Sequence, residues 1–430
     1  MIIHVVKAGD TLTSIAEQYG VTPERITIEN ELPNPENLII GQSIGIRIPD
    51  IVHTVMEGDT LFEVAQTYDV DANQILQNNP QIAAVQSLKP GDILVITYAQ
   101  EDVIDSIMIN GYAYPFIDKA VLRKTLPFLT YLSIFTYGFT AEGELVPVED
   151  EELIAIAKEF GVAPIMMLAP MDAKGAFNSE VAHNMFINPV GQATLIENIV
   201  TNMQAKGYRG LDIDFEFILP EDKEGFLNFI TAVNTALDAV GLLTLVALAP
   251  KTSGEMTGLL YEAHDYPTIG AVADIVLLMT YEWGYTFGPP MATAPLNNVR
   301  KVLEYGVSVI DPDKILMGIP NYAYDWPLPF VKGEIAAESL GNQEAIERAV
   351  RFGVTTIQFD ETAQVPYYIY RTPEGIEHIV WFDDVRSMDA KFRVIPELGL
   401  IGAGVWQIMK FFPGLWLVVD SLFIVEKDEA

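Results

Sequence analysis

Eight short hydrophobic segments, separated by stretches with helical periodicity, limit what residues 99–430 can fold into. Most of the segments are continuous apolar runs, which is typical of parallel strands buried on both faces. The predicted strands are Ser106–Ala113, Thr130–Tyr137, Ala163–Ala169, Gly210–Glu216, Leu243–Ala249, Asp274–Tyr281, Lys314–Pro320 and Ile401–Ile408. Helices are predicted between them, for example over Glu151–Phe160, Glu221–Val240 and Pro295–Tyr305. Eight strand–helix units predict an α/β fold, a (β/α)8 TIM barrel, whose functional residues lie at the C-terminal ends of the strands.

One segment, residues 321–384, is too long for a simple loop after the seventh strand. It contains one helix pattern and several strand-like pieces, over Gln343–Arg351, Thr355–Asp360, Tyr367–Thr372 and His378–Phe382. The segment therefore predicts a small α+β insertion in the barrel.

The N-terminal hundred residues contain an internal repeat. The stretch that begins at His4 matches the stretch that begins at His53, 49 residues later, and the offset is 50 by Gly41 and Gly91. Each copy predicts a strand, two helices and a strand, and its Gly-Asp-Thr turn is typical of a helix start. We therefore expect two small βααβ modules, over residues 1–49 and 50–98, followed by the barrel over residues 99–430.

The fourth predicted strand carries three carboxylates. Asp212, Asp214 and Glu216 alternate with apolar residues, so on a strand all three acids point to one face. Burying such a row is costly, because each ionised group loses hydration and repels its neighbours. A solvated edge strand is the structural alternative, but acids at the end of a barrel strand indicate an active site.

Aromatic and polar residues follow the other predicted strands at the same end of the barrel. Sugar rings stack on aromatic side chains through their apolar faces, while their hydroxyls bond to polar groups. Besides Tyr281, which we place with the acids, the candidate substrate-binding residues are Asn110, Tyr112, Tyr137, Glu282, Trp283, Asn321, Tyr322, Asp325 and Trp406.

The composition argues against several classes of partner. With 25 Lys and Arg against 59 Asp and Glu, the net charge of −34 disfavours nucleic acid and anionic membranes. There is no run of eighteen apolar residues and no basic-then-apolar N-terminus, so we expect neither a membrane span nor a classical secretion signal. Cysteine is absent and the 5 histidines are scattered, so no metal site or cofactor is predicted. We expect a monomer.

The repeats resemble LysM modules in the Gly-Asp-Thr-Leu turn, the later Asn30 or Asn79, and the closing strand. The resemblance implies binding of glycans that contain N-acetylglucosamine, such as peptidoglycan or chitin, in a groove beside that turn. A repeat that acts only as a spacer is the alternative.

The barrel resembles family 18 glycoside hydrolases. Residues 212–216 are similar to the family's Asp-x-Asp-x-Glu signature, and Met279-Thr280-Tyr281 and Trp406 are its usual companions. The resemblance implies a retaining mechanism in which the substrate's own acetamido oxygen is the nucleophile. Glu216 would be the acid and base, Asp214 would hold the acetamido group with Asp212 behind it, Tyr281 would bond the acetamido oxygen, and Trp406 would form the floor of the −1 site.

Two residues depart from the commonest chitinase pattern, Arg209 and Glu282, and the second puts chitin-specific geometry in question. The modules, the missing signal and residues 318–326 together resemble the spore-germination members of the family, which implies cleavage of cortex peptidoglycan and a location in the spore cortex or coat region. An ordinary chitinase and a non-catalytic glycan-binding lectin remain alternatives.

Overall fold

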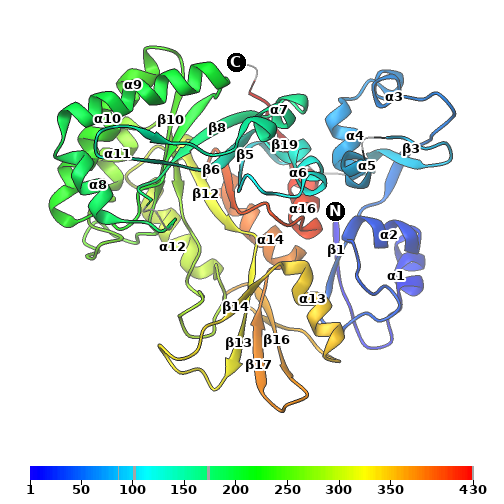
Figure 1. The fold of residues 1–430 in the computed structure, drawn as a ribbon. Helices are drawn as coiled ribbons and strands as arrows, with labels where there is room; N and C mark the ends of the chain where they lie inside the picture. Colours follow the sequence, from blue (N-terminus) through cyan, green and yellow to red (C-terminus); the bar gives the residue numbers. More distant parts are fainter. Residues whose placement is uncertain (86, 100–102, 172–174, 429–430) are drawn as a thin grey trace.

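The computed structural model describes residues 1–85, 87–99, 103–171 and 175–428. Figure 1 shows two small N-terminal modules beside a large α/β barrel, with a second small sheet projecting below the barrel. The predicted architecture of paired small modules, barrel and insertion is confirmed. Among the helices of the described ranges, none combines the length and hydrophobicity needed to cross a bilayer.

Each N-terminal module is a two-stranded antiparallel sheet covered by helices. The first comprises β1 (Ile2–Val5), α1 (Leu12–Tyr19), α2 (Pro23–Asn30) and β2 (Ser43–Ile46). The second comprises β3 (Pro49–Thr54), α3 (Leu61–Tyr68), α4 (Ala72–Asn78), α5 (Pro80–Val85) and β4 (Ile93–Tyr98). The prediction of two helices for each copy is wrong for the second module. The loop after its second helix, which carries the extra residue of the repeat, contains a third helix, α5.

The equivalent residues of the repeat make equivalent contacts. The Asn30 amide bonds to both backbone groups of Gly45, and the Asn79 amide does the same at Val95, so each pins the second helix to the last strand. His4 contacts the Asp10 carboxylate at 3.0 Å, and His53 contacts Asp59 at 2.8 Å. These residues stabilise the turn that begins each module.

Eight parallel strands close into the barrel, as predicted. Each pairs with the next along the chain, and the last pairs with the first. The barrel strands are β5 (Asp105–Ala113), β6 (Tyr131–Phe139), β8 (Ala163–Leu168), β9 (Gly210–Ile213), β10 (Leu243–Leu248), β11 (Ile275–Leu278), β12 (Ile315–Pro320) and β18 (Gly402–Trp406). Two short strands extend the sheet beside β6 and β5, namely β7 (Leu145–Val146) and β19 (Phe423–Val425).

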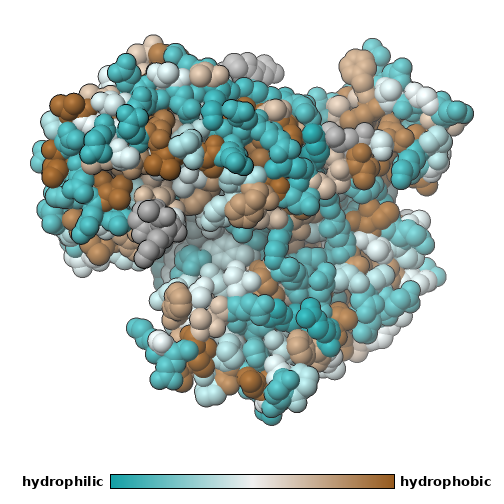
Figure 2. Space-filling model, in the orientation of Figure 1, coloured by the Kyte–Doolittle hydropathy of each residue, from teal (hydrophilic) through white to brown (hydrophobic). Residues whose placement is uncertain are grey.

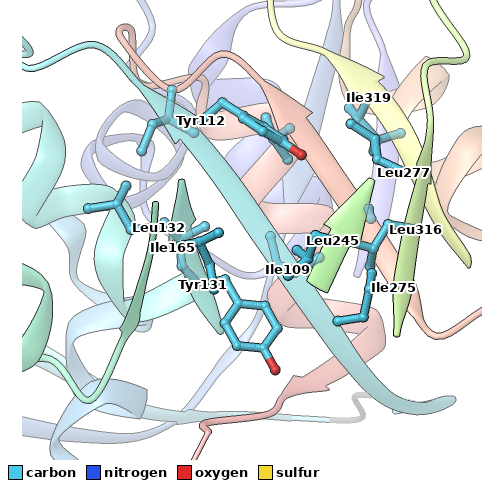
Figure 3. Close-up of a cluster of buried hydrophobic side chains, with 14 of the residues drawn as sticks. Ile109, Tyr112, Tyr131, Leu132, Ile165, Leu245, Ile275, Leu277, Leu316 and Ile319 are labelled. Atoms are coloured by element: carbon cyan, nitrogen blue, oxygen red, sulfur yellow. The ribbon is translucent and has the colours of Figure 1, made fainter. Parts of the chain in front are cut away.

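Helices surround the barrel, and their apolar faces pack on the strands. They are α6 (Lys119–Thr125), α7 (Glu151–Glu159), α8 (Ser179–Phe186), α9 (Pro189–Lys206), α10 (Lys223–Asp238), α11 (Tyr266–Val272), α12 (Leu296–Val307), α14 (Val385–Phe392), α15 (Val394–Leu398) and α16 (Pro413–Leu422), with single 3-10 turns at Leu126–Phe128, Pro220–Asp222 and Pro312–Lys314. Figure 3 shows part of the buried core, with the Tyr112 ring reaching away from β5 toward side chains of the opposite strands.

The insertion is a five-stranded antiparallel sheet in the order β14-β13-β17-β16-β15, packed on one helix. Its elements are β13 (Ala323–Leu328), β14 (Glu338–Leu340), α13 (Asn342–Arg351), β15 (Gln358–Asp360), β16 (Val365–Arg371) and β17 (Glu377–Trp381). The helix and the last three strands were predicted, whereas β13 and β14 were not.

Buried polar contacts fasten the two modules to each other and to the barrel. Arg25 of the first module donates to the Asn78 carbonyl of the second at 2.7 Å and to the Tyr98 hydroxyl at 2.5 Å. Arg47 lies 3.6 Å from the Tyr98 ring centroid and forms an ion pair with Asp420 on α16. Arg47 is only 3% exposed, so this ion pair is screened little by solvent.

The first module also contacts the insertion. Ile40 forms a parallel bridge with Thr356, and Arg386 of α14 donates to the Gly41 carbonyl at 2.9 Å. Ile39 is buried in the hydrophobic cluster of the insertion. On the other side, Asn73 of the second module donates to the Phe160 carbonyl of the barrel at 3.1 Å. The modules are therefore packed parts of one body.

Candidate active site

The three acids lie at the C-terminal end of β9, at the centre of the barrel. The strand itself ends at Ile213 rather than at Glu216 as predicted, although the Asp214 amide still donates to the Leu168 carbonyl at 3.0 Å. The alternation of side chains continues past the end of the strand. Phe215 points outward and is fully buried, with its ring stacked 5.7 Å from Phe226. The acids on either side of Phe215 consequently face the barrel interior.

Burial makes these acids hard to ionise. It raises the pKa of Asp212 to about 6, although Asp212 accepts a 2.7 Å hydrogen bond from the Tyr112 hydroxyl. Burial, then repulsion from Glu216 and Asp212, raises the pKa of Asp214 well above its usual value. Burial, then repulsion from Glu282, raises the pKa of Glu216 to about 7. The outermost acid therefore holds a proton near neutral pH while it remains partly accessible, which suits a proton donor.

Tyr281 lies beside this row, at the end of β11. Burial, then the charges of Asp214 and Glu216, raises the pKa of its phenol well above the usual value, so the hydroxyl stays protonated. Gly318 on β12 makes room for the ring, because a Cβ there would lie 2.8 Å from Cε1 of Tyr281. A protonated phenol among acids can donate a hydrogen bond to a substrate oxygen.

Glu282 connects the acids to the insertion. Its backbone has a φ of 67°, and its carboxylate accepts hydrogen bonds from the hydroxyls of Tyr322 and, at 3.2 Å, Tyr324. Partial desolvation raises the pKa of this carboxyl, although the residue is exposed, and the two hydroxyls oppose that shift. The insertion therefore fixes the fourth acid of the site.

Aromatic rings lie beside the acids, starting from Tyr112, which bonds to Asp212. Trp406, at the end of β18, lies 5.2 Å from Phe135, 5.7 Å from Tyr112 and 6.1 Å from Tyr114 between ring centroids. Phe116 stacks on Tyr114 at 5.3 Å and is 77% exposed. The rings thus run from the buried acids to the surface. Figure 2 shows that the surface is hollowed between the barrel and the insertion.

Three further predicted residues lie at strand ends near this site. Asn110 is buried and accepts a 3.1 Å hydrogen bond from Ser133. Asn321 donates to the Gln407 and Lys410 carbonyls at 3.0 and 2.9 Å, which ties the start of the insertion to the segment after β18. Trp283 is half-buried against the barrel core, after Glu282.

Two predicted substrate-binding residues are engaged elsewhere. The Tyr137 hydroxyl donates to Asp150 at 2.5 Å and accepts from Lys206 at 2.8 Å, between the barrel and helices α7 and α9. The register of β6 shifts between Ile134 and Tyr137, which turns Tyr137 away from the barrel interior.

Asp325 is buried inside the insertion, where it accepts from Arg348 at 2.5 Å and Tyr370 at 2.7 Å and contacts His378 at 2.8 Å. The placing of Tyr137 and Asp325 at the sugar site is therefore corrected.

The prediction omitted Tyr114, Phe135 and Tyr324, which the structure brings to the site. Tyr114 and Tyr324 follow strand ends among other aromatics, a signal that could have included them. Phe135 lies within β6, and its position depends on the same register shift that removes Tyr137. Within the described ranges, no group of three acidic or histidine side chains is arranged to hold a metal ion.

Comparison with known proteins identifies the family. The profile described as "Glycosyl hydrolases family 18" matches residues 175–410, and the LysM domain profile matches residues 4–47 and 53–97. The chain belongs to glycosyl hydrolases family 18. This glycoside hydrolase is 38% identical to the cortical fragment-lytic enzyme of Bacillus subtilis (strain 168) over 433 residues, 99% of each chain.

Solved structures agree with this family 18 assignment. The crystal structure of the Bacillus megaterium spore cortex-lytic enzyme SleL matches with a TM-score of 0.84 and 38% identity over 99% of both chains. The Bacillus cereus SleL structure matches with a TM-score of 0.83 and 32% identity over 99% of this chain and 98% of its own. By contrast, di-N-acetylchitobiase of Rattus norvegicus is 27% identical and covers 60% of this chain and 77% of its own.

Proposed function

We propose that this family 18 enzyme hydrolyses spore-cortex peptidoglycan during germination, as an N-acetylglucosaminidase that cuts between N-acetylglucosamine and a muramic-acid-derived sugar. The observation that carries the proposal is the row of buried acids, with Glu216 outermost and its pKa raised to about 7. Relatives described as cortical fragment-lytic and spore cortex-lytic enzymes, which match along 99% of the chain, support cortex as the substrate.

Glu216 is the proton donor of the proposed reaction. It protonates the glycosidic oxygen of the leaving muramic sugar, and the acetamido oxygen of the −1 N-acetylglucosamine attacks the anomeric carbon. Glu216, now ionised, takes a proton from the water that opens the oxazolinium ring. Because two displacements occur at the anomeric carbon, the configuration is retained.

The deeper acids and Tyr281 orient the acetamido group. Asp214 lies next to Glu216 and accepts from the acetamido N–H, which stabilises the cation that forms. Asp212, held by Tyr112, keeps a proton more readily than a solvated acid does and shares it with Asp214. Tyr281, kept protonated by burial, donates to the acetamido oxygen.

The remaining site residues bind the sugar chain. Trp406 stacks under the −1 sugar, and Glu282 and Tyr322 line the side of the cleft formed by the insertion. Asn110, Asn321 and Trp283 support the strand ends. No metal or cofactor is required by this chemistry, and we propose that the enzyme acts as a monomer in the cortex or coat region of the spore.

The LysM modules, which we delimit at residues 1–49 and 50–98 with the catalytic part at 99–430, are proposed to hold the same glycan. In the second module a cavity of about 490 Å³ lies beside the Gly-Asp-Thr turn at Thr60, next to Leu88. Phe160 of the barrel lines the same cavity. Its polar and apolar lining suits the hydroxyl edges and apolar faces of N-acetylglucosamine.

The test compares Glu216→Gln with the exposed acid variant Glu304→Gln on purified cortex peptidoglycan. Glu216→Gln removes the proton but keeps the shape, so the rate should fall about 10²- to 10⁴-fold, while Glu304→Gln keeps the wild-type rate. Muropeptide analysis should find N-acetylglucosamine at the new reducing ends.

Other products would reject the proposal. Muramic residues at the new reducing ends, or full turnover by Glu216→Gln, contradict it directly. A clear preference for soluble chitin oligomers would identify a chitinase, and binding without cleavage by the wild-type protein would identify a lectin.

A further inference from the structure

A fully buried histidine bridges the ends of two barrel strands beside the acids. Nδ1 of His264 accepts a 2.8 Å hydrogen bond from the amide of Ala249, directly after β10. Nε2 of the same ring donates to the carbonyl of Phe215 at 3.0 Å. These two contacts fix the tautomer, because a nitrogen that accepts from an amide carries no proton.

The carbonyl that His264 holds belongs to the residue between Asp214 and Glu216. The pairing between β9 and β10 ends at Ile213 and Val246. The segment that carries Asp214 and Glu216 therefore extends beyond the last residue that pairs with β10. The imidazole links the two backbones just past that point. After Glu216 the chain turns through Phe217, whose φ is 54°.

His264 is itself held by a second buried polar residue. Nζ of Lys251 donates to the His264 carbonyl at 3.0 Å and to the Tyr261 carbonyl at 3.1 Å. The Lys251 amide donates to the Tyr266 hydroxyl, which donates to the Ala249 carbonyl at 2.6 Å. Lys251 is 2% exposed and His264 is 0% exposed, so the bridge lies in an environment where hydrogen bonds are strong.

The ring stays neutral in this position. Burial lowers the pKa of His264 to about 4, and the nearby Lys251 ammonium adds to that shift. A proton on Nδ1 would also face the Ala249 amide, which needs that nitrogen as an acceptor. His264 therefore holds one hydrogen-bond pattern across the pH range in which Glu216 titrates.

We propose that His264, backed by Lys251, is a positioning residue that fixes the Phe215 peptide and thereby keeps Asp214 and Glu216 in line for the two steps of the reaction. The inference rests on the roles proposed above for these two acids. His264 does not contact the sugar. It holds the peptide between Asp214, which binds the acetamido N–H, and Glu216, which transfers the proton.

A purely structural role makes different predictions. If His264 only stabilises the loop between β10 and α11, its loss lowers the melting temperature but leaves the reaction rate of the folded enzyme unchanged. If it positions the acids, its loss lowers kcat more than it changes KM, because most contacts to the bound sugar are made by residues other than these two acids. Small displacements of catalytic groups can cost about 10²-fold in rate.

The experiment uses the full chain and solubilised cortex fragments at a temperature where every variant is folded by circular dichroism. His264→Leu removes both hydrogen bonds, whereas His264→Gln offers an amide acceptor and donor with the same separation as the two ring nitrogens. Lys251→Met is the second variant, in case His264→Leu does not fold. His183→Leu, which removes a 2.9 Å hydrogen bond between the partly exposed His183 on α8 and Asp222, is the matched control.

We expect kcat of His264→Leu to fall about 10- to 100-fold with KM within about threefold, and His264→Gln to recover most of kcat. Lys251→Met should show a smaller fall in kcat, and His183→Leu none. Wild-type kcat in folded His264→Leu, an equal loss in His264→Leu and His264→Gln, or a loss confined to KM would overturn the inference. If Lys251→Met alone folds, wild-type kcat in that variant overturns it. Failure of the wild type to cleave the fragments would instead reject the proposed function.

Discussion

The pH dependence of the enzyme follows from the environment of Glu216. The acid must be protonated to act, and burial with repulsion from Glu282 raises its pKa to about 7. The protonated fraction is then about one half at pH 7, about a tenth at pH 8 and about a hundredth at pH 9. From pH 7 to pH 9, kcat/KM should therefore fall about 50-fold.

The assay is initial-rate release of reducing ends from cortex fragments between pH 5 and pH 9, with circular dichroism to show that the protein stays folded. Because kcat/KM reports the free enzyme, the alkaline limb gives the proton affinity of the interacting acids at the barrel mouth. Glu282→Gln removes a repelling charge, so it should move the limb to lower pH, while the exposed Glu304→Gln should leave it in place.

A flat kcat/KM between pH 7 and pH 9 would refute this reasoning, since it would mean that no proton on Glu216 is required. A limb that begins near the ordinary value for a glutamic acid would show that the site is more solvated than its packing implies. An alkaline limb that moves to higher pH in Glu282→Gln would contradict the proposed repulsion between Glu282 and Glu216.

Two further changes test the acids and the corrected residues. Asp212 has a pKa of about 6 in the fold against an ordinary value of 3.8, so the folded state binds the proton more tightly. The associated stability is present below pH 4 and lost as pH rises through 6. Asp212→Asn should therefore raise the unfolding free energy by about 3 kcal/mol at pH 8 and hardly change it at pH 4, as measured by thermal melts; a lower melting temperature at pH 8 would contradict this. Tyr137→Phe should keep kcat/KM within about twofold but cost about 1–3 kcal/mol of stability, because buried Asp150 loses a donor; a selective loss of activity without destabilisation would return Tyr137 to the sugar site.

The barrel could be predicted because its strands are buried on both faces. Continuous apolar runs such as Leu243–Leu248 distinguish parallel strands, and eight of them with helices between have one common closed arrangement. The acid row could be predicted for a related reason. Alternation places Asp212, Asp214 and Glu216 on one side whether or not the strand formally continues.

The misplaced residues depend on contacts that no local pattern contains. Tyr137 faces away from the interior because a register shift in β6 changes which side chains point inward, and alternation cannot indicate where such a shift occurs. Asp325 follows a strand end, as a binding residue would, but its partners Arg348, Tyr370 and His378 are 23 to 53 positions away in sequence. Its role is decided by the packing of the insertion.

In the sequence, His264 is one of 5 scattered histidines. Its proposed positioning role depends on the two backbone atoms that it contacts, Ala249 N and Phe215 O, which lie 15 and 49 positions away along the chain. A sequence pattern based on side-chain types cannot indicate a side chain that acts on backbone.

The contacts that hold the N-terminal modules have a mechanical consequence. Among the described residues, the contacts of Arg47 with Asp420, Ile40 with Thr356 and Asn73 with Phe160 hold the modules against the rest of the chain. The spacing between the cavity at Thr60 and Glu216 is thus built into the molecule. We expect a minimum substrate length as a result. A polysaccharide strand too short to span that interval can bind in the module cavity or be cut at Glu216, but it cannot do both at once.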